Sequence, residues 1–331
     1  MDEVLLLLIL VFAAGVAFDF INGFHDTANA IATVVATRVL SLRTAILMAA
    51  GFNVFGALTG TAVAETIGSG LVDEGSVTQS VVLAALVGAI VWNLLTWWFG
   101  IPSSSSHALI GGLLGAGAVH GGFKVWQWTG IEKTLVALVG SPIIGLIGGL
   151  LLITIVSWLT FRIRPSTGTR IFRVLQLFSA AFMAFSHGSN DAQKTMGILT
   201  LALFTAGRID TFHVPFWVMI TAALAMGAGT AAGGRRIIHT MGDKIIKLNP
   251  IHGFAAETAA ASVIYAASHL GFPVSTTHVI SSSIMGVGAV RGRGGVRWGV
   301  ARTIVSAWVL TIPACMIVSG VCYLLLSIWF E

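Results

Sequence analysis

The chain has 331 residues, of which 56% are hydrophobic and only 9% are charged. Because soluble domains carry about 25% charged residues, this composition excludes a soluble globular protein and predicts an all-α polytopic membrane protein. The formal net charge of +5 does not indicate nucleic-acid binding, since most basic residues gather in four short clusters between hydrophobic stretches.

Five hydrophobic units are predicted in each half of the chain, because a membrane-spanning helix needs about 20 apolar residues. The first half contains 4–21 continuing as a broken helix through 24–37, then 44–64, 79–100, 103–119 and 134–160. The second half contains 174–187 continuing as a broken helix through 189–206, then 214–234, 251–270, 273–290 and 303–330. We expect about 10–12 transmembrane segments, in an N-terminal repeat (1–161), a basic cytoplasmic hinge (162–173) and a C-terminal repeat (174–331).

The basic clusters determine the expected orientation. Cytoplasmic loops carry an excess of Lys and Arg, and an odd number of crossings per half inverts the second repeat relative to the first. All four clusters are then cytoplasmic, and both chain termini are extracytoplasmic. The clusters are Arg38 and Arg43; Arg162, Arg164, Arg170 and Arg173; Arg235, Arg236, Lys244 and Lys247; and Arg291, Arg293, Arg297 and Arg302.

A polar motif interrupts the first helix of each half. Residues 22–30 read NGFHDTANA, residues 187–195 read HGSNDAQKT, and Asp26 recurs as Asp191 at an offset of 165. A carboxylate inside a membrane segment indicates a functional site, and amide oxygens beside it suit a small hard cation. The alternative is that these residues only cap helix ends. The predicted cation ligands are Asp26, Asp191, Asn22, Asn29 and Asn190.

A hydroxyl motif recurs later in each half, at an offset of 171. Residues 102–107 read PSSSSH and residues 273–278 read PVSTTH. Proline and hydroxyl residues favour a helix start, and a helix N-terminus binds oxyanions such as phosphate. N-capping alone explains one hydroxyl in each motif, but not three. The joints are either loops between full spans or tips of hairpins that approach from opposite faces; buried polar groups favour hairpins.

The two motif pairs constrain each other. Asp26 and Asp191 would repel an oxyanion held on the nearby helix ends, and Lys194 supplies at most one positive charge. A bound cation, or protonation of the carboxylates, removes that conflict. The sequence therefore favours cation-coupled transport over a bare anion pore, with sodium and protons both open as the coupling ion.

Three further residues are expected to support the site. Glu257 is an intramembrane acid without a counterpart in the first half, since the equivalent position is Leu86. His107 and His278 recur at one position of the hydroxyl motif. For these histidines a structural hydrogen bond close to the site is favoured over phosphate donation or proton relay.

The motifs GFHDTANA, HGSNDAQKT, PSSSSH and PVSTTH, in this order along nearly the whole chain, resemble those of the inorganic phosphate transporter family. That family includes bacterial low-affinity phosphate carriers and animal sodium–phosphate symporters. The resemblance implies an all-helical inverted repeat, inward phosphate transport coupled to a cation, and a homodimer. It places Asp26 and Asp191 on the family's two signature aspartates, and Glu257 on a glutamate of the second half.

The chain departs from the family pattern at three positions. His25 stands where many members have Asn, and Gln193 and Lys194 replace a Ser–Asn or Ala–Asn pair. These forms resemble bacterial members, so we expect a bacterial plasma membrane protein with both termini extracytoplasmic. Bacterial relatives include proton-coupled carriers and sulfate permeases, so the coupling ion and the oxyanion stay open.

Together these features predict a secondary active transporter, not an enzyme, that moves inorganic phosphate into the cell with sodium as co-substrate, by alternating access and without a cofactor. The alternatives are a proton-coupled phosphate or sulfate symporter of the same fold, and an anion channel. A serine hydrolase built on Ser106–His107 or Thr277–His278 is rejected, because adjacent residues do not easily present nucleophile and base to each other. The predicted phosphate ligands are Ser104, Ser105, Ser106, Ser275, Thr276, Thr277 and Gln193.

Overall fold

A computed structural model describes residues 3–73, 75–292 and 294–330, so Arg293 of the fourth basic cluster lies outside the described residues. The regular elements within these ranges are helical, which confirms the predicted all-α class. The first half contains α1 (Glu3–Ala36), α2 (Leu42–Ala57), α3 (Ala62–Gly70), α4 (Gln79–Phe99), α5 (Ser105–Gly121) and α6 (Trp128–Thr160). The second half contains α7 (Pro165–Thr205), α8 (Phe216–Ala232), α9 (Arg235–His239), α10 (Pro250–His269), α11 (Thr276–Ala289) and α12 (Trp298–Phe330).

In each half a long helix is followed by a bent pair of helices, two helices of a hairpin and a second long helix. By length and apolar composition, six described helices could each cross a membrane, or eight spans result if the bent pairs α2–α3 and α8–α9 each form one. The axes of α2 and α3 differ by 70°. The remaining two units are α10 and α11, and α11 has only 14 residues. The second half therefore carries its hydroxyl motif on helices that are more polar or shorter than an ordinary span.

The first helix of each half is continuous, which corrects the expected breaks. α1 runs through 34 residues and α7 through 41 residues, across both carboxylate motifs. The glycines taken as breaks serve close packing instead. A Cβ at Gly23 would overlap the backbone of Met226, and a Cβ at Gly188 would overlap that of Asn53. A helical glycine costs only about 1 kcal/mol, so it does not by itself end a helix.

Local sequence explains where the later helices begin and end. Side chains of Thr78 and Asn249 cap the first turns of α4 and α10 by accepting backbone N–H bonds. Gly100 and Gly271 follow the ends of α4 and α10 with φ of 65° and 69°, a left-handed conformation that favours glycine. These glycines lie 171 residues apart, the offset of the hydroxyl motifs, so both halves turn back at equivalent positions.

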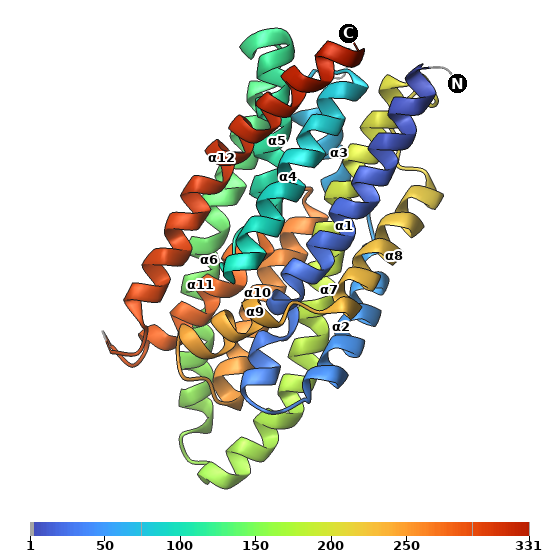
Figure 1. Cartoon of the computed structure of the whole chain (residues 1–331). Coiled ribbons are helices and arrows are strands. Elements are labelled where there is room, and N and C mark those ends of the chain that lie inside the picture. Colours follow the sequence, from blue (N-terminus) through green and yellow to red (C-terminus); the bar gives the residue numbers. More distant parts are fainter. Residues whose placement is uncertain (1–2, 74, 293, 331) are drawn as a thin grey trace.

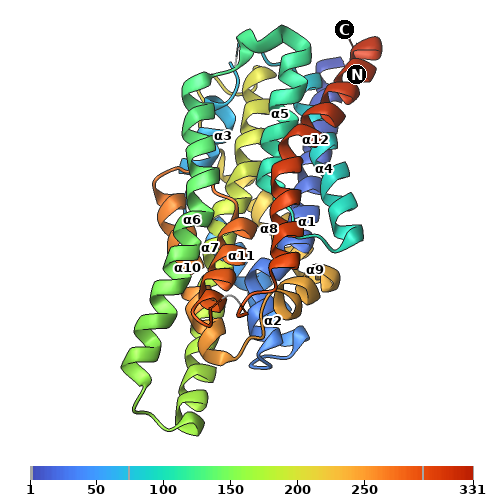
Figure 2. The ribbon, with the colours of Figure 1, turned by 90° about the vertical axis from the view of Figure 1, so that its left-hand side faces the viewer.

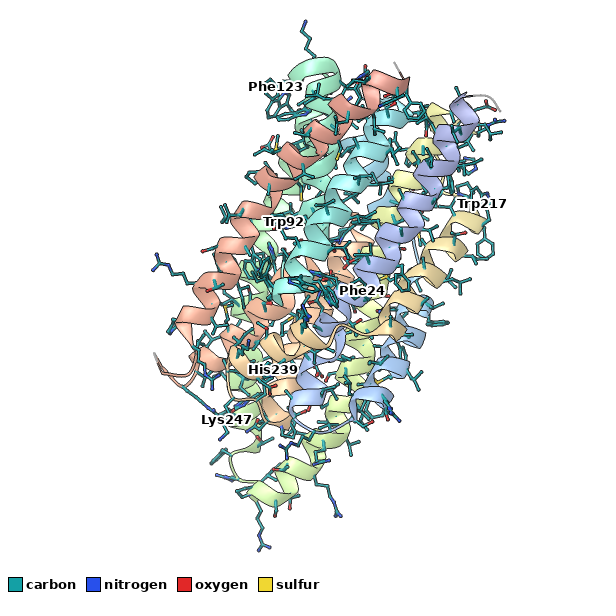
Figure 3. The ribbon with its side chains drawn as sticks, in the orientation of Figure 1. Phe24, Trp92, Phe123, Trp217, His239 and Lys247 are labelled. Atoms are coloured by element: carbon teal, nitrogen blue, oxygen red, sulfur yellow. The ribbon has the colours of Figure 1, made fainter. Side chains whose placement is uncertain are left out.

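The hydroxyl motifs lie at the tips of two helical hairpins. In Figures 1 and 2 the α4–α5 hairpin lies toward the end that carries both chain termini, and α10–α11 lies toward the opposite end. The α6–α7 connection also lies at that opposite end (Figure 1), and it is shorter than the expected hinge, because α6 ends at Thr160 and α7 begins at Pro165. Figure 3 places Lys247 toward the same end and Phe123 at the end with the termini.

The two halves pack on each other in matching pairs. α1 of the first half packs on α8, and α7 of the second half packs on α2. In the same way α5 packs on α12, and α11 packs on α6. Large apolar side chains such as Val136, Ile144 and Val309 remain exposed along α6 and α12. Such surfaces suit lipid, while the polar motifs lie in the interior.

Candidate functional site

The hairpin tips are ordered by equivalent N-caps. Ser104 Oγ accepts the backbone N–H of His107 at 3.1 Å, and Ser275 Oγ accepts that of His278 at 3.3 Å. Ser104 Oγ also contacts His107 Nδ1 at 2.8 Å. Both serines have extended backbone conformations, as N-caps require. Ser104 and Ser275 thus fix the first turns of α5 and α11, whose backbone N–H groups lack intrahelical partners.

The two tips meet each other in the interior. The rings of His107 and His278 lie 4.3 Å apart between centroids, and His278 stacks on Trp308 at 3.9 Å. Trp308 Nε1 donates to the carbonyl of Pro102 at 3.2 Å. Ser106 Oγ donates to the carbonyl of Val274 at 3.3 Å, from one tip to the other. The histidines therefore pack beside the site: the His107 ring contacts Ser104, while Nε2 of His278 has no hydrogen-bond partner among the described residues.

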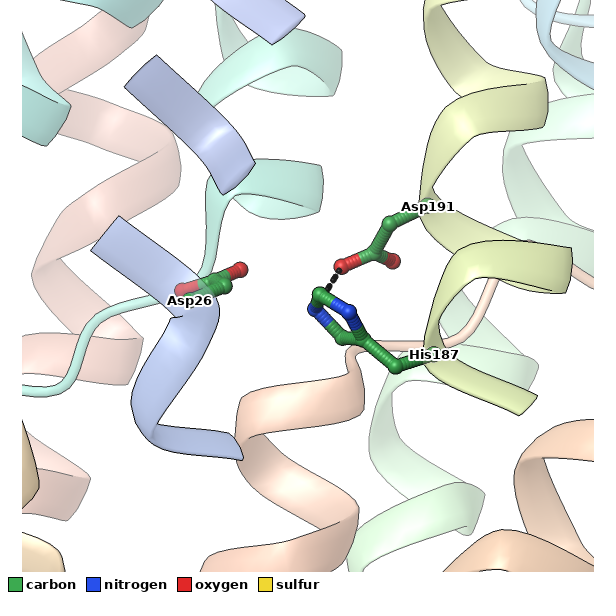
Figure 4. A group of neighbouring side chains, drawn as sticks. All are labelled: Asp26, His187 and Asp191. Atoms are coloured by element: carbon green, nitrogen blue, oxygen red, sulfur yellow. Dashed lines mark ion pairs between the residues drawn. The ribbon is translucent and has the colours of Figure 1, made fainter. Parts of the chain in front are cut away.

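Two carboxylates face each other beside these tips. Figure 4 shows Asp26 on α1 opposite Asp191 and His187 on α7. One ligand atom from each of the three residues lies within 4.8 Å of the others, and Asp26 and Asp191 are 2% and 0% exposed. Two unit charges at that separation repel by about 3 kcal/mol at an effective dielectric constant of about 20. With both carboxylates ionised, the arrangement therefore requires positive charge between or beside them.

Equivalent hydroxyl groups bind the two carboxylates. Ser105 Oγ donates to Asp26 Oδ2 at 2.9 Å, and Thr276 Oγ1 donates to Asp191 Oδ2 at 2.8 Å. Ser105 and Thr276 lie 171 residues apart, as the hydroxyl motifs do. Thr277 Oγ1 lies 3.4 Å from Asp26 Oδ1 and so connects the second hairpin to the first-half carboxylate. The structure brings both motif pairs into one buried cluster.

The cationic partners of the two carboxylates differ. His25 Nδ1 lies 2.7 Å from Asp26 Oδ1. Asp191 forms an ion pair with Lys194, and His187 Nε2 lies 3.1 Å from Asp191 Oδ2. Asp26 therefore contacts one nitrogen group, an imidazole, whereas Asp191 contacts both an imidazole and an ammonium.

The three predicted amide ligands present oxygen atoms without partners. Asn29 Nδ2 donates to Thr277 Oγ1 at 2.9 Å, and Asn190 Nδ2 donates to Ser268 Oγ at 3.0 Å near the end of α10. Within the described residues, Oδ1 of Asn22, Asn29 and Asn190 is buried without a hydrogen-bond partner. Buried polar atoms are normally paired, so unpaired acceptor oxygens here indicate places for a ligand.

Two residues of the expected set lie apart from the cluster. Gln193 Oε1 accepts the N–H of Val63 at 2.8 Å and so caps the start of α3. Glu257 accepts from Thr33 Oγ1 at 2.5 Å and Gln176 Nε2 at 3.0 Å, and also from Ser179. Thr33 follows Asp26 by seven residues on α1, or roughly 10 Å along the helix axis. Among the described residues, the hydrogen bonds of both side chains go to partners outside the hairpin tips.

Two residues of the interior were not among the predicted ligands. His187 lies at the start of the second carboxylate motif, at the position equivalent to Asn22. This equivalence in the repeat could have identified His187, because Asn22 was itself a predicted ligand. Asp19 Oδ1 accepts from Thr195 Oγ1 at 2.9 Å, while its Oδ2 is buried without a partner among the described residues. The sequence around Asp19 is apolar, and it does not distinguish a buried functional acid from an acid near the membrane surface.

The comparisons with known proteins agree with this geometry. The profile of the phosphate transporter family matches residues 22–319. A probable low-affinity inorganic phosphate transporter of Rhizobium meliloti is 54% identical over 319 residues, covering 96% of each chain. One of Bacillus subtilis is 46% identical over 333 residues, covering all of both chains. Relatives are thus named as transporters, a non-enzymatic function.

A solved structure shows the same architecture. A protein described as the sodium-dependent phosphate transporter superposes with a TM-score of 0.91, at 25% sequence identity, over 98% of this chain and 99% of its own. The apolar helices, the buried carboxylates between paired hairpin tips and these similarities lead to one conclusion: the chain is a multi-pass membrane protein that belongs to the phosphate transporter family.

Proposed function

We propose that this protein carries inorganic phosphate into the cell together with sodium, by alternating access. One observation supports this most strongly: two hydroxyl-bearing helix N-termini, those of α5 and α11, meet at the buried carboxylates Asp26 and Asp191. Helix N-termini attract an oxyanion, whereas carboxylates repel one. A site with both is suited to binding an anion only when a cation is bound too.

Sodium binds at the carboxylates in this proposal. Its ligands come from Asp26 and Asp191 and from the amide oxygens of Asn22, Asn29 and Asn190, which have no other partner among the described residues. Carboxylate and amide oxygens suit hard cations. The sodium dependence printed for the structural neighbour supports this choice of ion.

Phosphate binds at the two tips. Ser105, Ser106, Thr276 and Thr277 provide rotatable O–H donors next to the first-turn N–H groups of α5 and α11, and sodium on the carboxylates releases these hydroxyls to phosphate. Ser104 and Ser275 hold the tips in shape and remain close enough to contribute. Gln193 is proposed to act through α3, whose N-terminus it caps, since its side-chain amide hydrogen-bonds to Val63 and Ser189.

Alternating access follows from the arrangement of the halves. We infer that residues 1–161 and 174–331 are inverted-topology repeats joined at 162–173, because equivalent helices pack in matching pairs and the hairpins lie toward opposite ends (Figure 2). Rocking of one repeat against the other would open the tips to each side in turn. A bacterial plasma membrane location, extracytoplasmic termini and a homodimer complete the proposal; the homodimer rests on the family resemblance.

Proton coupling is a second candidate, and one contact favours it. Thr96 Oγ1 has an acceptor in the carbonyl of Trp92 at 2.9 Å, and with its hydrogen placed there its oxygen accepts from His25 Nε2, which lies 3.1 Å away. The 2.7 Å contact between His25 Nδ1 and Asp26 then needs a further proton. A His–Asp pair that holds this proton would replace sodium as the coupling ion in the first half.

Phosphate binding to the purified protein tests the proposal. Labelled phosphate should bind in sodium chloride and lose at least about tenfold in affinity in choline chloride at the same pH, with reciprocal enhancement of sodium binding by phosphate. Sulfate should compete weakly. Equal phosphate binding in both salts, together with an affinity that follows pH, would favour the proton-coupled alternative.

A further inference from the structure

The ammonium group of Lys194 is bound like an ion inside the candidate site. Lys194 is 2% exposed and forms an ion pair with Asp191. Its Nζ also donates to Ser106 Oγ at 2.5 Å and to the carbonyl oxygen of Val274 at 2.9 Å. A lysine ammonium has three N–H donors, so one carboxylate, one hydroxyl and one carbonyl oxygen take all three. These oxygen types also coordinate hard metal cations.

The equivalent position in the first half carries no charge. Subtracting the 165-residue offset of the carboxylate motifs from Lys194 gives Asn29. Asn29 donates to Thr277, the equivalent of Ser106, and Thr277 in turn contacts Asp26. The Oδ1 atom of Asn29 is buried without a partner in the part of the chain that the structure describes. Equivalent hydroxyl and carboxylate groups therefore lie beside the Lys194 ammonium at Asp191 and beside the Asn29 amide, whose oxygen is unpaired, at Asp26.

We propose that Lys194 is a tethered cation that permanently occupies the place of an exchangeable cation at Asp191. This narrows the sodium site proposed above: of its two carboxylates, only Asp26 then binds an exchangeable cation, and Asp191 binds the ammonium of Lys194. Because the ammonium stays bound to the protein throughout the transport cycle, each phosphate enters with one exchangeable cation instead of two. The inference rests on the proposed sodium-coupled transport of phosphate and determines its stoichiometry.

The ratio of sodium to phosphate flux tests this inference. Proteoliposomes would take up labelled sodium and labelled phosphate in parallel, with wild-type protein, with Lys194→Asn, and with Lys124→Asn as the matched control in an exposed turn. We expect about one sodium per phosphate for the wild type and the control, and about two for Lys194→Asn. A wild-type ratio of two, or an unchanged ratio in Lys194→Asn, would overturn the inference.

Thermal unfolding in detergent provides a readout that needs no transport. A ligand that binds only the folded protein raises its unfolding temperature with concentration. Sodium should therefore raise the unfolding temperature of Lys194→Asn more than that of the wild type, because the variant has a second vacant carboxylate site. Equal sodium-dependent shifts in both proteins would contradict the tethered-cation role.

The two proposals fail in different ways. If neither phosphate uptake nor the unfolding temperature of the wild-type protein depends on sodium, both the proposed sodium coupling and the role of Lys194 are overturned. Sodium-dependent uptake of the wild type, combined with an unchanged flux ratio in Lys194→Asn, would overturn the role of Lys194 alone. The wild-type flux ratio is informative even where Lys194→Asn does not fold.

Discussion

At the scale of single residues, the site balances charge in a medium that provides little solvation. Asp26 and Asp191 are buried, and each accepts a hydroxyl hydrogen bond from a hairpin tip and contacts at least one nitrogen group. Hydrogen bonds to a carboxylate contribute about 1.5–3 kcal/mol each, which is less than the cost of leaving such a charge unpaired in the interior. In the proposed mechanism, the bound cation therefore controls whether the anion site forms.

Asp26→Asn should remove sodium-driven phosphate uptake. The amide is close in size to the carboxylate but carries no charge, so the cation site loses its main ligand, and we expect uptake to fall by at least about tenfold. The variant should still elute as a folded protein. Asp210→Asn, at an exposed position, is the matched control and should transport normally. Normal sodium-driven uptake by Asp26→Asn would exclude Asp26 from the cation site.

Ser105→Ala should weaken phosphate binding more than it weakens the fold. It removes a hydroxyl that sodium is proposed to release from Asp26 to phosphate, but it leaves the N-cap at Ser104 in place. We expect the phosphate concentration for half-maximal uptake to rise about tenfold, in line with a lost hydrogen bond to a charged group. Ser69→Ala, at a half-buried serine that donates to the Glu65 carbonyl, is the control. An unchanged phosphate dependence in Ser105→Ala would separate this hydroxyl from the phosphate site.

Residue types in the motifs were enough to predict which groups would meet, but not all of their partners. Asp26, Asp191 and the hydroxyls of both tips recur at two fixed offsets, and repetition of costly polar groups carries information about function. Gln193 could not be placed from its motif, because the N–H group that it caps belongs to Val63, in the other half of the chain. Its environment depends on tertiary packing that no local pattern encodes.

At the scale of elements, close helix packing holds the carboxylates in register. α1 packs on α8 and α7 packs on α2, with Gly23 and Gly188 at the closest approaches. The sequence predicts breaks at these glycines, since glycine is typical both of helix ends and of close contacts between membrane helices. Only the backbone of the neighbouring helix distinguishes the two. The turns gave a clearer signal, because Pro102 and Pro273 follow Gly100 and Gly271 after one residue, but the sequence left hairpins and full spans both open.

Gly23→Ala should destabilise the contact between α1 and α8. Its new methyl group would overlap the carbonyl of Met226, and overpacking of this kind costs about 1–3 kcal/mol. Gly51→Ala is the control, because a Cβ at Gly51 meets nothing within 4 Å in α2. Thermal unfolding in detergent should show a lower unfolding temperature for Gly23→Ala and an equal or higher one for Gly51→Ala. Equal stability of both variants would contradict the close packing.

At the scale of the whole molecule, both termini lie at one end and the α6–α7 connection lies at the other (Figure 1). The basic cluster around that connection predicts that its end is cytoplasmic. Composition and charge were enough to predict the helical class and the succession of units. The depth that each hairpin reaches depends on how its tip packs against the other tip. That packing, seen at the contact between His107 and His278, appears only in the folded structure.

Labelling of single cysteines tests this orientation. In a background with Cys315→Ala and Cys322→Ala, an impermeant maleimide should label Lys124→Cys in intact cells. It should label Thr167→Cys only after the membrane is opened, because the two exposed positions lie at opposite ends. Labelling of both from outside would contradict the arrangement of the ends. The reverse pattern would keep the fold and invert its orientation.

Accumulation of labelled phosphate in proteoliposomes tests the central proposal most directly, with inward sodium and proton gradients imposed separately and sulfate added as competitor. Sodium-coupled transport predicts that phosphate concentrates inside the vesicles only under the sodium gradient, and that sulfate has little effect. Accumulation under the proton gradient alone would transfer the coupling to the His25–Asp26 pair. Equilibration of phosphate without accumulation under either gradient would contradict coupled transport and indicate an anion channel.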